Sequence, residues 1–122
     1  MLISTAISGF PHLVYLVTTS GLRILGDIHD SKDDTEKSIH HFEKAIEIAS
    51  SLNLDDQLFW VHYSLAELFF KEGKLDDAHA RIERAKPHAL NDPYDLGRAM
   101  ELQARFWYKR RTLSDEAKSS RL

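Results

Sequence analysis

Residues 22–29 read LRILGDIH and residues 38–45 read SIHHFEKA, and the same arrangement returns 40 positions later as HYSLAELF at 62–69 and AHARIERA at 78–85. At positions 22, 25, 26, 29, 38, 42 and 45, small residues fall on small residues 40 positions later and large residues on large ones. The first of these positions holds Leu22 in one copy and His62 in the other. The chain is therefore predicted to contain one structural unit twice in succession.

Each copy has the spacing of two amphipathic helices. Its apolar residues recur at intervals of three and four, which places them on one face of a helix. Small residues at Gly26 and Ser38, and at Ala66 and Ala78, allow the two helices of a unit to approach closely. Because one hairpin cannot bury its apolar face alone, neighbouring hairpins are expected to stack.

This spacing resembles the tetratricopeptide repeat, whose signature is W-x2-L-G-x2-Y followed by A, F and P. Leu25-Gly26 and Leu65-Ala66 stand at the L-G pair, and Gly73 stands at the turn between the helices of the second unit. The chain departs from the signature at the first aromatic and at the closing proline. Its period is 40 residues, whereas the family period is about 34.

The resemblance implies an all-α fold, an antiparallel helix-hairpin solenoid of about two and a half repeats. The repeats are expected at about 19–52, 53–90 and 91–122, the last one incomplete. After a first helix at about 19–31, helices are expected at about 35–52, 56–72 and 75–89. Asp33 stands where the second unit has Gly73, and Asp34 or Asp33 is expected to cap the helix that follows.

The third unit is expected to start at Asn91-Asp92-Pro93, where Asn or Asp is the capping residue and the proline suits a first helical turn. Ala104 and Trp107 are expected to take its small and aromatic packing positions. Its first helix is expected to end near Arg111, before a turn and a short second helix.

The composition is ordinary for one soluble domain, with 122 residues, 43% hydrophobic and 29% charged. A net charge of −3 gives no electrostatic reason to expect a nucleic-acid partner. The absence of cysteine excludes disulfide frameworks, zinc ribbons and thiol chemistry, and it agrees with a cytoplasmic location.

Residues 1–18 differ from the rest because they contain no Lys, Arg, Asp or Glu. As a signal peptide this segment lacks a basic n-region, and as a membrane span it is interrupted by polar residues, Gly9 and Pro11. We interpret it as an apolar segment that packs on the first repeat, with a helix starting near Pro11. No membrane partner is expected.

The sequence contains no motif that indicates catalysis. It has no H-E-x-x-H, no phosphate-binding glycine loop, no G-x-G-x-x-G and no nucleophile elbow. Among the seven histidines, His40 and His41 are adjacent and point to different faces, and His62 falls at a packing position. The histidines are interpreted as structural or solvated, and neither an enzyme, a metal site nor a cofactor is predicted.

The resemblance also implies a binding surface, because residues beside the packing stripe of each unit's first helix face the concave side of such a superhelix. By register these are Arg23, Asp27, Trp60, Tyr63, Glu67, Phe70, Arg98, Glu101, Arg105 and Tyr108. Trp, Tyr and Arg contribute much of the binding energy of protein interfaces. We therefore predict a groove that binds a peptide or a neighbouring domain. The competing interpretation is that these aromatics are ordinary core residues or stack on a missing neighbour.

Two further expectations concern partners. Family members that bind the acidic C-termini of chaperones use Lys and Asn along the groove, and the residues here disfavour that partner. The open ends of the solenoid favour self-association.

The stretches LGDIH, HFEKAIEIA and GKLDDAHARIERAK also resemble the long repeats of fungal signal-transducing ATPases of the NB-ARC or NACHT kind. The alternative function is thus a sensor or regulatory fragment of a larger ATPase.

Overall fold

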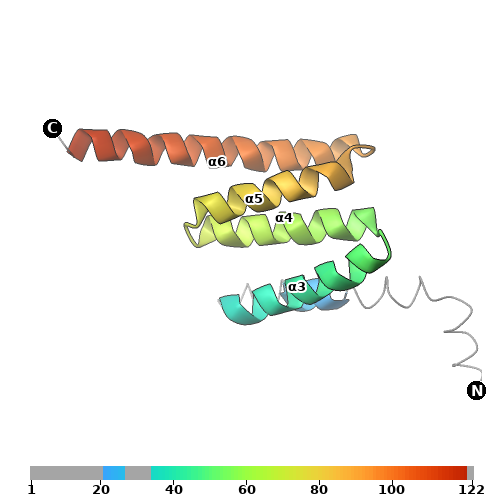
Figure 1. Ribbon diagram of the computed structural model, residues 1–122. Coiled ribbons are helices and arrows are strands. Elements are labelled where there is room, and N and C mark those ends of the chain that lie inside the picture. The colour runs from blue at the N-terminus through green and yellow to red at the C-terminus, as the bar shows by residue number, and fades with distance from the viewer. Residues whose placement is uncertain (1–20, 27–33, 121–122) are drawn as a thin grey trace, which may run out of the picture.

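The computed structural model describes residues 21–26 and 34–120, and all regular structure in these ranges is helical. Residues 21–26 form one helical segment, followed by α3 (Thr35–Ser51), α4 (Asp55–Lys71), α5 (Leu75–Ala85), the short 3-10 helix η1 (Lys86–Ala89) and α6 (Pro93–Ser120). Successive helices run antiparallel and lie side by side (Figure 1), and α4 packs against α3, α5, η1 and α6. The predicted all-α class is confirmed for this part of the chain. The interpretations of residues 1–18, Asp27 and Asp33 lie outside it.

Gly26 brings the first helical segment close to α3. A Cβ atom added to Gly26 would lie 2.7 Å from Cε1 of Phe42, so no other residue fits without a shift. On the same side, the Ser38 hydroxyl donates a 2.8 Å hydrogen bond to the Gly26 carbonyl. The predicted close approach between the small residues of the first unit is confirmed.

The predicted helix starts are confirmed where capping residues mark them. The Asp34 carboxylate accepts a hydrogen bond from the Lys37 amide at 3.4 Å at the start of α3. The Asp92 carboxylate accepts from the amides of Tyr94 and Asp95, at 3.1 and 3.3 Å, at the start of α6. These contacts satisfy amide groups that have no partner inside the helix.

Gly73 sits in the turn between α4 and α5 with a left-handed φ of +78°. Because nothing lies within 4 Å of a Cβ added there, a substitution would act through backbone conformation alone. We expect Gly73→Ala to lower the free energy of unfolding by about 1 kcal/mol, measured by urea denaturation. A variant as stable as the wild type would show that the turn does not require this conformation.

Pro87 changes the helix that was expected to run to Ala89. Proline has no amide hydrogen, and its ring clashes with the carbonyl four residues before it. The α-helical part of the segment accordingly ends at Ala85, and the chain continues as η1 through Lys86–Ala89.

The core divides into clusters between neighbouring helices. Phe42, Leu65 and Leu68 belong to a cluster between α3 and α4. A second cluster contains Phe59, Ala85, Ala89 and Ala99, and a third contains Ala66, Ile82, Leu102 and Phe106. Residue by residue, the burial pattern from Thr35 to Ser50 is the same as that from Leu75 to Leu90. The second helices of the two units therefore use equivalent positions for packing.

The prediction for the third unit is wrong in two respects. First, α6 is a single helix from Pro93 to Ser120, with no turn near residue 111. No Gly or Pro follows Gly97, so the sequence has no residue that stops the helix. Second, Ala104 and Trp107 are exposed, Trp107 by 53%.

The packing residues of α6 are instead Ala99, Leu102 and Phe106, which are buried against α4 and α5. Their spacing of three and four residues is helical, but it is offset from the register that the second unit implied. Toward its C-terminus α6 continues past the start of α5 (Figure 1). Among the described helices, none combines the length and the apolar character that crossing a bilayer requires.

Candidate functional site

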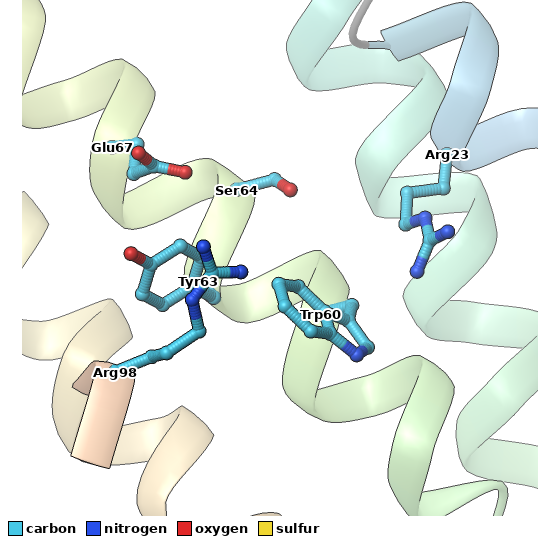
Figure 2. A pocket seen from close by; sticks show the side chains of 6 residues that line it. All are labelled: Arg23, Trp60, Tyr63, Ser64, Glu67 and Arg98. Carbon is cyan, nitrogen blue, oxygen red and sulfur yellow. The ribbon is translucent and has the colours of Figure 1, made fainter. Parts of the chain in front are cut away.

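A hollow of about 560 Å³ opens on one side of α4. Its lining residues are Arg23, Trp60, Tyr63, Ser64, Glu67 and Arg98. They come from the segment 21–26, from α4 and from α6, so the hollow spans three helices that are not consecutive in the chain. Figure 2 shows Tyr63 and Trp60 side by side on α4, with Arg98 reaching over Tyr63 from α6 and Arg23 across from them.

Arg98 is held by aromatic rings. Its guanidinium carbon lies 5.3 Å from the ring centre of Trp60, 6.0 Å from that of Tyr63 and 5.4 Å from that of Tyr94. These distances are typical of cation–π contacts, which stabilise the cation without occupying its N–H groups. Within the described residues, no carboxylate lies at ion-pair distance from Arg98. Its planar edge can therefore bind an incoming carboxylate.

A second hollow of about 520 Å³ lies about two helical turns further along α4 and α6. It is lined by Phe70, Glu101, Ala104, Arg105, Tyr108 and Lys109. Arg105 repeats the arrangement of the first hollow, with its guanidinium carbon 5.3 Å from the ring centre of Phe70. We call the two hollows together the groove.

The groove brings together the sequence-predicted residues that the structure describes. Arg23, Trp60, Tyr63, Glu67 and Arg98 line the first hollow, and Phe70, Glu101, Arg105 and Tyr108 line the second. Asp27 lies outside the described residues. Sequence reasoning missed Ser64 and Lys109, which follow predicted residues by one position, and it missed Tyr94. It also placed Ala104 in the core, whereas Ala104 lines the second hollow.

The groove is partly shielded from water and carries charges of both signs. Burial raises the pKa of Tyr63 above its ordinary value, and the nearby carboxylate of Glu67 raises it further. The bases Arg23, Arg98, Arg105 and Lys109 outnumber the acids Glu67 and Glu101, although the whole chain carries −3. The surface of the groove thus combines aromatic rings with an excess of positive charge.

His62 lies behind this surface, with only 7% of its area exposed. Its ring stacks on His88 at 6.0 Å with an interplanar angle of 6°, and His88 contacts the Asp55 carboxylate at 2.9 Å. Burial lowers the pKa of His62 to about 4, and Arg81, His88 and Arg84 contribute in the same direction. The prediction that His62 falls at a packing position is confirmed. Among the residues described, no three His, Asp or Glu side chains are grouped to hold a metal ion.

The His62 environment predicts an acid-sensitive fold. In the unfolded chain His62 binds a proton near the ordinary histidine pKa of 6.5, and in the folded chain only near 4, so acidification within this window favours unfolding. From about pH 7.5 to about pH 4.5 we expect His62 to remove on the order of 2 kcal/mol of stability. The measurement is urea denaturation across this range, comparing wild type with His62→Phe.

Another group changes stability with pH in the opposite direction. The contribution of His62 is therefore measured as the difference between wild type and His62→Phe. Burial and the neighbouring Asp92 raise the pKa of Asp95, so protonation of Asp95 at low pH stabilises the fold. Both proteins contain Asp95. Equal dependence of stability on pH in both proteins would contradict the assignment to His62.

Comparison with protein-family models, with curated proteins and with solved structures finds no match. The evidence for function therefore lies in the groove itself.

Proposed function

We propose that the chain is a tetratricopeptide-like interaction module that binds an extended peptide segment of another protein in the groove. The observation that carries this proposal is the origin of the lining residues. They come from residues 21–26, α4 and α6, whereas α3 and α5 contribute none. A stack of hairpins in which alternate helices share one face has this arrangement, and the shared face is where an extended segment can lie.

The internal repetition supports the solenoid interpretation. The second helices of two successive units have the same burial pattern at an offset of 40 residues. Ser38 and Ala78 are both buried at the equivalent position, as are Phe42 and Ile82. Repeated packing of this kind extends in one direction and leaves a continuous face along the stack.

The chemistry of the groove supports a peptide ligand. Trp60, Tyr63 and Phe70 are half-buried, so each ring keeps a face for contact while its orientation is fixed by packing. Arg98 and Arg105 are already ordered against these rings. Preordered aromatic and arginine side chains lose little conformational entropy on binding. We propose that the rings take apolar side chains of the peptide and that the guanidinium groups take its carboxylates.

The test is a selection of peptides from a random library on the immobilised chain, followed by binding measurements in solution. The chain contains only two tryptophans, so Trp107→Phe leaves Trp60 as the sole indole reporter. We expect selected peptides to share a carboxylate near an apolar residue and to change Trp60 fluorescence on binding. Failure to enrich any peptide, or binding without a change at Trp60, would contradict the proposal.

A further inference from the structure

The groove repeats one arrangement at a fixed interval. Arg98 lies over the ring of Tyr63 and Arg105 over the ring of Phe70, with distances of 6.0 and 5.3 Å from guanidinium carbon to ring centre. Both members of the second pair follow those of the first by seven residues. The helices α4 and α6 point the same way, because each runs antiparallel to α5 between them (Figure 1). At 1.5 Å per residue, the two pairs lie about 10.5 Å apart along the groove.

The two hollows of the groove differ in chemistry. The surface inside the first hollow is mostly polar, and that inside the second is mostly apolar. In the first hollow the ring of Tyr63 already contacts Arg98, whose N–H groups stay available for a carboxylate. In the second hollow Ala104 offers only a methyl group beside the rings of Phe70 and Tyr108, and Tyr108 is 75% exposed. The first hollow therefore suits a carboxylate, and the second suits an apolar side chain.

The walls of the groove restrict the backbone conformation of an extended ligand. The lining residues belong to helices, whose backbone N–H and C=O groups pair within the helix. An extended ligand therefore finds no strand edge to pair with, and its own backbone groups stay in water. The polyproline II conformation keeps its backbone solvated in this way.

The spacing of the hollows favours the same conformation. Polyproline II has three residues per turn, so it returns a side chain to the same side every about 9.3 Å. A β-strand does so at about 6.7 Å and again at about 13 Å. Of these spacings, the polyproline II repeat comes nearest to the distance of about 10.5 Å between the hollows.

We propose that the groove recognises a polyproline II segment in which an acidic residue and an apolar residue are separated by two positions. This inference rests on the proposed function and adds to it the conformation and the motif of the peptide. The carboxylate binds Arg98 in the first hollow, and the apolar side chain enters the second hollow over Ala104. Ala104 thereby determines the size of the side chain that fits, because a larger residue would fill the hollow.

The experiment uses short peptides, capped at both ends, in which glutamate and leucine are separated by two prolines, in both orders. Control peptides separate the same two residues by one proline or by three. The receptor is the full chain with Trp107→Phe, in which Trp60 reports binding. We expect the two-proline spacing to bind about tenfold more tightly than either control in one of the two orders. Because prolines disrupt a helix interior, this binding also excludes a helical ligand.

A second measurement tests the role of Ala104. Ala104→Leu is compared with Ala80→Leu, which changes an exposed alanine of α5 that lines neither hollow. We expect Ala104→Leu to weaken the two-proline leucine peptide by about tenfold and to change little for a peptide with alanine in place of the leucine. Ala80→Leu should change neither affinity. Circular dichroism of both variants should match that of the wild type.

Two results would overturn the inference: equal affinities at all three spacings, or an Ala104→Leu variant that binds the leucine peptide as tightly as Ala80→Leu does. Binding of library-selected peptides without binding of any proline peptide would also overturn it, and would leave the proposed function intact. A library that enriches no peptide would contradict both.

Discussion

Replacing Phe106 by Ala should lower the free energy of unfolding by about 3–5 kcal/mol. The Phe106 ring is fully buried in the cluster that joins α4, α5 and α6, and it stacks on the ring of His79 at 4.7 Å. Removing the ring leaves a cavity, and α6 then packs less firmly against the other helices. The measurement is urea denaturation followed by circular dichroism.

Trp107 is the matched control, because it is the adjacent aromatic residue on the same helix and is half exposed. Its ring contacts Phe106 and His79 only edge to face, at 5.0 and 5.5 Å. We expect Trp107→Ala to cost about 1 kcal/mol, within the range of one aromatic pair. If Trp107→Ala cost more than Phe106→Ala, the register of α6 would be the one that the sequence implied.

Replacing Arg98 by Ala should weaken binding of a groove-selected peptide by about tenfold or more. Arg98 lies among Trp60, Tyr63 and Tyr94, so its loss removes a preordered carboxylate site and one wall of the first hollow. The fold should change little, since a cation–π contact at such a site contributes about 0.5–1 kcal/mol. Fluorescence titration gives the affinity, and thermal melting gives the stability.

Arg84→Ala is the control for Arg98→Ala, because Arg84 is exposed on α5 and lines neither hollow. We expect this variant to bind peptide as the wild type does. Equal weakening by both variants would indicate a general charge effect and would exclude the groove as the binding site. Tyr63→Ala is less informative, because the half-buried Tyr63 also packs against two core clusters, so its loss would lower stability as well as binding.

The first two units could be predicted from the sequence because single residues determine them. Gly26 and Ser38 mark a close helix contact, Gly73 marks a left-handed turn, and Asp34 marks a helix start. Each of these features depends on the backbone or on neighbours that are near in sequence. Such local signals do not require knowledge of the packing between distant segments.

The third unit could not be predicted in the same way. No Gly or Pro interrupts the chain after Gly97, so the end of α6 has no local signal. Its buried residues are decided by the fit against α4 and α5, which selects Phe106 rather than the adjacent Trp107. The sequence nevertheless placed the groove residues Arg98 and Arg105 together. The offset between the predicted and the observed register of α6 is small, so both residues stay on the same broad side of the helix.

The most direct test of peptide binding in the groove is a titration of the isotope-labelled chain with a selected peptide, followed by its amide NMR signals. Binding in the groove predicts shifts that concentrate at Tyr63, Glu67 and Arg98, with small changes at exposed positions of α3 and α5 such as Glu47 and Arg84. Shifts centred on α3 and α5, with Tyr63 and Arg98 unmoved, would contradict it.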